Sequence, residues 1–209
     1  MEGMDYEVLM AEDFCQWESD VRFHDITHDD MKNGPGLRVV LWVAGCDHHC
    51  RECQNPLTWD PDGGAPFTQW EQAEFYEWLL KPWTQGVTFS GGDPLHPVNR
   101  EPIGKMAKAI KQRNPDKDIW VYTGYVLQAS EKGCRLWDQE GNAFEYPYLE
   151  YFDVLIDGRF DADRRREDLR NERIPKWRGS SNQRIIDVKK TLESGAVVEW
   201  EDLTWKSIM

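Results

Sequence analysis

The sequence contains no long uninterrupted stretch of hydrophobic residues. Its longest apolar run covers six residues, from Val39 to Ala44, whereas a helix that crosses a bilayer needs about 20. The first thirty residues mix acidic and apolar side chains and contain no apolar segment of the kind that a secretory signal requires. We therefore expect a cytoplasmic protein with no membrane partner.

Basic residues are also scarce. Lys and Arg number 25 against 38 Asp and Glu, so the formal net charge is -13. Proteins that bind nucleic acid through its phosphates are normally basic, so we expect no nucleic-acid partner. The charge is uneven, because residues 159–190 carry eleven Lys or Arg against six acidic residues, a local net charge of +5. This basic stretch is either solvated surface or a docking site for an acidic partner.

Cysteine is too scarce and too clustered for a disulfide framework. There are five cysteines, and three of them, Cys46, Cys50 and Cys53, fall within eight residues. An odd number of thiols without a secretory signal favours a reducing compartment and a metal site. Cys15 and Cys134 are predicted to be thiols outside this site.

The remaining composition is that of one folded domain. The chain has 209 residues, of which 40% are hydrophobic, and its 11 Trp add bulk for a single core. Helical spacing and a capping box from Thr68 to Glu71 predict a helix over 68–81, and a second helix contains residues 103–110. Short apolar runs predict strands at 37–44, 87–90, 119–122 and 154–156. Alternating strands and helices predict an α/β fold built on a parallel sheet.

The cysteine spacing places three thiols on one loop after the strand predicted at 37–44. One interpretation is a zinc ion with a fourth ligand from a nearby histidine. The candidates for that ligand are His24, His28, His48 and His49. The other interpretation is an iron–sulfur cube, in which three thiolates leave one iron open to a non-protein ligand. The spacing alone favours neither.

The segment Gly91-Gly92-Asp93-Pro94 follows the next predicted strand. Two residues without Cβ atoms allow a ligand to approach the backbone, and a carboxylate accepts hydrogen bonds from an ammonium group. The same residues also make an ordinary tight turn. Because the carboxyl ends of parallel strands meet at one edge, this loop, the cysteine loop and the loop at Thr123 are expected to lie together.

Taken together, these motifs resemble those of the radical S-adenosylmethionine enzymes. Within that superfamily, six segments look like the activating proteins of anaerobic ribonucleoside-triphosphate reductases. They are NGPGLR (33–38), GCDHHCRECQNPLTW (45–59), SGGDPLHPVN (90–99), DIWVYTGY (118–125), DVLIDGRF (153–160) and RGSSNQRIIDV (178–188). The resemblance covers roughly residues 23–190 in order.

The resemblance implies a radical S-adenosylmethionine domain over 23–190, with insertions near 131–148 and 159–178. An acidic N-terminal extension would cover 1–22, and an acidic C-terminal tail would cover 191–209. A complete (β/α)8 barrel takes about 250 residues, so the implied fold is a partial parallel (β/α) barrel. Such a barrel is open along one side, where a macromolecular substrate has access.

The resemblance also implies a site and a reaction. Cys46, Cys50 and Cys53 would hold a [4Fe-4S] cluster whose open iron binds S-adenosylmethionine. The residues implied at the cofactor are Glu52, Cys53, Gln54, Gly91, Gly92, Asp93 and, at its ribose, Thr123. The protein would reductively cleave S-adenosylmethionine and remove an α-hydrogen from a glycine in the large subunit of the reductase. An electron donor such as flavodoxin would supply the electron, and no catalytic residue is implied beyond the cluster and the cofactor.

Two alternatives remain at this point. One is another small radical S-adenosylmethionine enzyme with a different substrate. The other is a non-catalytic Cys3His zinc-binding interaction module. An iron–sulfur protein is brown and sensitive to air, whereas a zinc protein is colourless.

Overall fold

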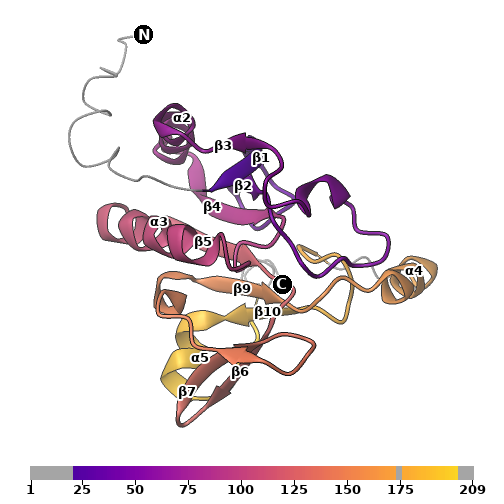
Figure 1. Ribbon diagram of the computed structural model, residues 1–209. Helices are drawn as coiled ribbons and strands as arrows, with labels where there is room; N and C mark the ends of the chain where they lie inside the picture. The colour runs from indigo at the N-terminus through magenta and orange to yellow at the C-terminus, as the bar shows by residue number, and fades with distance from the viewer. Residues whose placement is uncertain (1–20, 173–175, 202–209) are drawn as a thin grey trace.

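The computed structural model describes residues 21–172 and 176–201. These residues form one main sheet, a small second sheet and helices that follow the strands (Figure 1). In chain order the elements are β1 (Arg22–Asp30), β2 (Leu37–Val43), η1 (Pro56–Thr58), β3 (Ala65–Pro66), α2 (Gln69–Leu79), β4 (Thr84–Gly91), α3 (Arg100–Arg113), β5 (Asp118–Tyr122), β6 (Val126–Ser130), β7 (Gly133–Trp137), β8 (Ala143–Phe144), η2 (Leu149–Tyr151), β9 (Val154–Asp157), α4 (Ala162–Arg170), β10 (Arg184–Asp187) and α5 (Val188–Ser194).

The main sheet is mixed, with the strand order β10-β9-β5-β4-β2-β1-β3. Its central strands β2, β4, β5 and β9 run parallel, as the sequence predicts. The prediction of a parallel sheet is wrong at the edges, where β1 pairs antiparallel with β2, and β10 pairs antiparallel with β9. Strands β1 and β2 are joined by only six residues, 31–36. So short a connection permits an antiparallel pair but not a parallel crossover.

One face of the sheet carries the main hydrophobic core. Helices α2, α3 and α5 pack there against strand residues such as Leu41, Phe89 and Val121 (Figure 1). Helix α2 begins after Thr68, and the predicted capping box with Glu71 is present. The helix buries Phe75 and Leu79, which are four residues apart, so both lie on the side that faces the sheet. None of the described helices is long and apolar enough to cross a membrane.

The opposite face carries a separate apolar cluster to which no described helix contributes. Trp120, Val154 and Ile156 form it, and Trp177 and Trp200 pack against it. The ring of Trp200 lies 5.1 Å from that of Trp120, centroid to centroid. The described fold therefore continues past residue 190, where the sequence predicted a tail. At the other end, Val21 is buried and β1 begins at Arg22, inside the predicted N-terminal extension.

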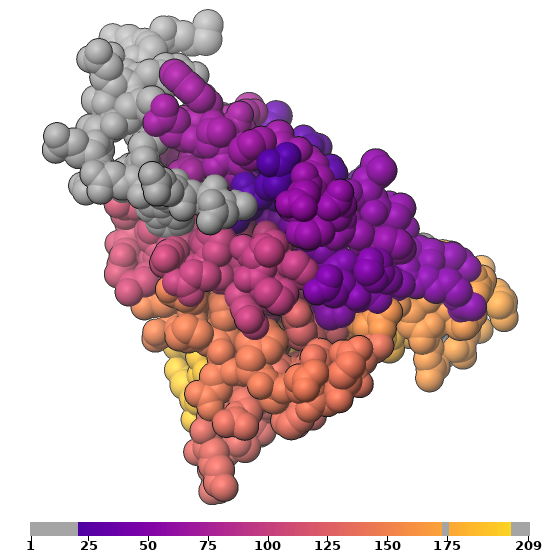
Figure 2. Space-filling view, viewed as in Figure 1, coloured from indigo at the N-terminus to yellow at the C-terminus, as the bar shows by residue number. Residues whose placement is uncertain are grey.

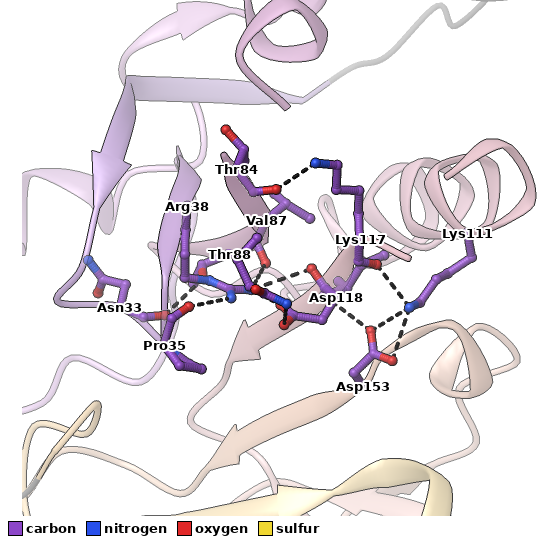
Figure 3. A network of polar contacts seen from close by, with 12 residues as sticks. Asn33, Pro35, Arg38, Thr84, Val87, Thr88, Lys111, Lys117, Asp118 and Asp153 are labelled. Carbon is purple, nitrogen blue, oxygen red and sulfur yellow. Dashed lines mark hydrogen bonds and ion pairs between the residues drawn. The ribbon is translucent and has the colours of Figure 1, made fainter. Parts of the chain in front are cut away.

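A buried arginine lies on this second face, at the amino ends of the parallel strands (Figure 3). The side chain of Arg38 is 0% exposed and forms an ion pair with Asp118. Its guanidinium donates hydrogen bonds to Thr88 Oγ1 (2.8 Å), Val87 O (2.8 Å) and Pro35 O (3.1 Å). Thr88 in turn donates to Asn33 O at 2.8 Å. These contacts fix the loop 31–36 against the sheet and give the NGPGLR motif a structural role.

The two predicted insertions both contain regular structure. Residues 131–148 include β7 and β8, which form a three-stranded antiparallel sheet with β6. Residues 159–178 include α4. Both segments lack apolar periodicity because they bury few side chains. Helix α4, for example, buries only Ala162 and Asp168.

Candidate functional site

A cavity lies at the carboxyl ends of β2, β4, β5 and β9, where the sequence placed the site. Cys46, Cys50 and Cys53 all line it, and so do most of the residues predicted to bind the cofactor. Those residues are Gln54, Gly91, Gly92, Asp93 and Thr123. Four loops that are distant in sequence therefore meet at one cavity. The predicted residue that does not line it is Glu52.

The three cysteines are free thiols of intermediate exposure. Burial, together with the negative charges of Asp93, Cys50 and Cys53, raises the pKa of the Cys46 thiol to about 12. A hydrogen bond with the backbone of His48 acts in the opposite direction and lowers this pKa. A thiol in this environment becomes a thiolate when a bound cation stabilises its charge. In the described part of the chain, no three His, Cys, Asp or Glu side chains lie close enough together to hold a single metal ion.

The carboxylate of Asp93 connects three of the loops. It is 2% exposed and accepts hydrogen bonds from two backbone amides, Leu95 N at 2.7 Å and Gly124 N at 2.8 Å. The hydroxyl of Thr123 lies 3.0 Å from both carboxylate oxygens. His48 Nε2, on the cysteine loop, lies 2.7 Å from Asp93 Oδ2. Asp93 therefore holds the cysteine loop, the loop after β4 and the loop after β5 together.

These contacts show partners that sequence reasoning did not find. The sequence assigned Asp93 to the ammonium group of a cofactor and Thr123 to its ribose. In the structure the Thr123 hydroxyl contacts Asp93 and also accepts a hydrogen bond from Tyr125 N at 3.2 Å. A role at the cofactor stays a prediction for both residues.

The two glycines allow loops to approach one another closely. Gly91 has φ +102, and a Cβ there would lie 2.8 Å from the backbone of Trp42. A Cβ at Gly92 would lie 2.5 Å from the carbonyl oxygen of Gly45, at the start of the cysteine loop. The sequence predicted a close approach by a ligand. The structure shows a close approach by neighbouring backbone, which any side chain at these positions would obstruct.

One histidine, His48, and one arginine, Arg159, also line the cavity. Of the four histidines considered as zinc ligands, His48 lines the cavity, whereas the ring of His28 stacks on Trp78 and that of His49 packs edge-on against Trp59. Arg159 also lines the cavity and donates a hydrogen bond to His48 O. Sequence reasoning did not single out Arg159. It lies on the loop that begins after the strand predicted at 154–156, so the rule that found the other loops also applies to it.

Comparisons with known proteins agree with this geometry. The 4Fe-4S single cluster domain family matches residues 32–186. The chain is 40% identical over 156 residues to the anaerobic ribonucleoside-triphosphate reductase-activating protein of Enterobacteria phage T4, covering 75% of this chain and 87% of the phage protein. The chain belongs to this family. The protein of the same name from Escherichia coli K12 is 38% identical over 165 residues, which cover 78% of this chain and 96% of that protein.

Family membership confirms the resemblance drawn from the six sequence segments. The region that matches the 4Fe-4S single cluster domain, residues 32–186, contains the three clustered cysteines and all four loops around the cavity. It also contains α4 and the β6–β7–β8 sheet. An iron–sulfur cluster is thus the metal centre that the comparison supports.

Proposed function

We propose that this chain activates an anaerobic ribonucleoside-triphosphate reductase by generating a glycyl radical in its large subunit. The observation that carries the proposal is that three clustered cysteines line one cavity in a chain of the activating-protein family. The cluster and S-adenosylmethionine, when bound, supply the reductive one-electron chemistry. The electron comes from a donor such as flavodoxin.

The residues present fit a [4Fe-4S] cluster. Cys46, Cys50 and Cys53 supply thiolates, which are the usual protein ligands of such clusters. Three thiolates leave one coordination position for S-adenosylmethionine. Asp93 keeps three loops in place around the cavity, and Gly91 and Gly92 allow close packing against the neighbouring backbone. The chain's own contribution is therefore to position the reactants and to exclude competing reactions.

We also propose that the sheet acts as a partial, open barrel. The main core, with three helices, lies on one face of the sheet, and the cluster of Trp120 on the other face includes no residue from a described helix. A second cavity adjoins the cysteine cavity and shares Tyr122 and Phe160 with it. A glycine-bearing segment of a large protein reaches the site through such an open face.

The deciding experiment is anaerobic reconstitution with iron and sulfide. The proposal predicts a brown protein with about four irons and four sulfides, the composition of one [4Fe-4S] cluster. It also predicts a glycyl radical, seen by paramagnetic resonance, after S-adenosylmethionine, reductant and reductase are added. A colourless protein that retains one zinc would indicate the Cys3His module instead. Cofactor cleavage without radical formation in the reductase would indicate another radical S-adenosylmethionine enzyme.

Asp93→Asn is expected to weaken S-adenosylmethionine binding by about ten-fold or more without removing iron. Hydrogen bonds to a charged group contribute about 1.5–3 kcal/mol, and the amide of Asn turns one acceptor oxygen into a donor. Anaerobic calorimetry on the reconstituted protein measures the affinity. Asp47→Asn is the matched control, because Asp47 is 70% exposed on the cysteine loop and pairs with His96. Equal affinities for wild type and Asp93→Asn would contradict the assignment.

The arginines of the basic stretch have different surroundings. Arg164 pairs with Glu167 at 3.2 Å on the same helix, and Arg166 pairs with Glu52 at 2.6 Å. Arg165 lines the second cavity, and the described structure gives its side chain no ion pair. If the basic stretch docks an acidic surface of the reductase, Arg165 is the residue of the three that is available for it.

Arg165→Glu is therefore expected to slow association with the reductase several-fold at low salt, because electrostatic steering acts mainly on the association rate. The difference from wild type should shrink as salt is added. Lys132→Glu, an equal charge reversal at an exposed residue between β6 and β7 and outside the basic stretch, is the control. Stopped-flow association at two salt concentrations tests this. Unchanged rates for Arg165→Glu would identify the basic stretch as solvated surface.

A further inference from the structure

The tip of the cysteine loop, residues 50–53, contacts helix α4 from more than a hundred residues away. Arg166 Nη1 lies 2.6 Å from both carboxylate oxygens of Glu52. Arg51 Nη2 lies 2.5 Å from Asp163 Oδ2, and Arg166 Nη2 lies 2.6 Å from Asp163 Oδ1. Arg51 and Glu52, which are adjacent on the loop, are thus each paired with a residue of opposite charge on the helix. Figures 1 and 2 show this segment and α4 side by side at the same edge of the molecule.

The other polar contacts of the tip are local. Cys53 N donates to Cys50 O at 3.1 Å, and Asn55 N donates to Cys53 Sγ at 3.4 Å. Glu52 has φ +58, a left-handed conformation that is unfavourable for a residue with a side chain. Within residues 21–172 and 176–201, the hydrogen bonds and ion pairs that join the tip to distant segments all go to α4.

Helix α4 is itself anchored to the fold. At its start, Asp161 N donates a hydrogen bond to Ser180 Oγ at 3.0 Å, on the segment that precedes β10. At the other end the buried carboxylate of Asp168 accepts one from Ser181 N at 2.9 Å. The loop that leads into the helix passes the cysteine cavity at Phe160. The helix therefore provides a fixed surface to which the tip is attached.

We propose that α4 clamps the cysteine loop, and that Glu52 and Arg166 are positioning residues that keep Cys50 and Cys53 directed into the cavity. This inference rests on the proposed function, because the cysteines it positions are those that would hold the cluster. It gives Glu52 a different role from the one that the resemblance implied. Glu52 acts through Arg166 and does not touch the cofactor.

The clamp controls how often the loop opens. A single exposed ion pair stabilises little. Here four charges form one network, and two of them, Arg51 and Glu52, lie between Cys50 and Cys53 in the sequence. Their contacts with α4 therefore oppose the opening of this loop directly. Opening of the loop would expose the irons that Cys50 and Cys53 would hold to water and chelators. Loss of the Glu52–Arg166 contact should therefore raise the rate of iron loss while the rest of the fold stays intact.

The test compares Glu52→Arg, Arg166→Glu and the double variant that carries both changes, all reconstituted anaerobically as full-length protein. We expect each single variant to lose iron to a ferrous chelator roughly five-fold faster than wild type, because small changes in interaction energy shift an equilibrium by that factor. The double variant restores the pair with its charges exchanged, so it should recover most of the stability of the cluster. Arg164→Glu, whose partner Glu167 lies on the same helix, should leave the rate unchanged.

Two further measurements separate this inference from the proposed function. Hydrogen exchange over residues 45–55 of the metal-free chain should be faster in both single variants and slower again in the double variant, whether or not a cluster forms in any of them. The resonance spectrum of the reduced cluster should change in the single variants and return in the double variant. Equal exchange and chelation rates in all proteins would overturn the clamp. So would weaker S-adenosylmethionine binding in Glu52→Arg and in the double variant, with Arg166→Glu unaffected, because Glu52 would then act on the cofactor itself.

Discussion

Cys50→Ala is expected to abolish iron binding and S-adenosylmethionine cleavage together. Cys50 lines the cavity together with Cys46 and Cys53, and alanine offers no group that binds iron. The proposed assignment gives the cluster three protein thiolates where four are usual, and we expect the two that remain in this variant to be too few to hold it. Iron and sulfide analysis after anaerobic reconstitution, followed by assay of methionine and 5′-deoxyadenosine, measures both losses.

Cys134→Ser is the control for this experiment. Cys134 lies on β7, in the small second sheet, and is not among the residues of the cysteine cavity. Its substitution removes a thiol of the same type, and we expect a full complement of iron and normal cofactor cleavage. Loss of iron in Cys134→Ser, or retention of a complete cluster in Cys50→Ala, would contradict the assignment of the ligands.

Asp118→Asn is expected to lower the free energy of unfolding by about 3 kcal/mol, because the change removes the negative charge that compensates the fully buried guanidinium of Arg38. Arg38 has no exposed side-chain surface, and its guanidinium lies among backbone carbonyls and the Asp118 carboxylate (Figure 3). Those carbonyls still accept hydrogen bonds in the variant, so we expect the protein to fold. Urea denaturation of the metal-free protein, followed by tryptophan fluorescence, measures the change.

Lys105→Ala provides the comparison for Asp118→Asn. It removes an ion pair with Glu101 in which the two side chains are 59% and 57% exposed. Pairs of this kind contribute about 0.5 kcal/mol or less. Similar losses of stability in the two variants would show that the ion pair of the buried Arg38 stabilises the fold no more than an exposed ion pair does.

The sequence predicts those parts of the fold that bury apolar side chains at regular spacing. The strands β2, β4, β5 and β9 and the helix α2 were found this way. Strand β1 was not, because its sequence, RFHDITHDD, carries charges on both faces. Helix α4 was also missed. It is fixed by its cap and by ion pairs, and neither gives a periodic apolar signal.

The positions of the site loops were predicted because a simple rule places them at the carboxyl ends of parallel strands. The partners within the site could not be predicted. Asp93 bonds to His48, which lies 45 residues earlier, and Glu52 pairs with Arg166, which lies 114 residues later. Charged residues are frequent in this chain, so the sequence alone offers many possible partners for each. Only the folded backbone selects among them.

A ligand that binds at the carboxylate of Asp93 has to displace one of the hydrogen-bond donors already there. A carboxylate has about four lone-pair positions, and Leu95 N, Gly124 N, Thr123 and His48 already use them. Two of these donors are backbone amides. The Thr123 hydroxyl contacts both carboxylate oxygens and also accepts a hydrogen bond from Tyr125 N. The ammonium group that we propose to bind at Asp93 would therefore compete with His48. Its apparent affinity would equal its intrinsic affinity multiplied by the fraction of molecules in which His48 has already left Asp93. The departure of His48 would also release the cysteine loop from Asp93.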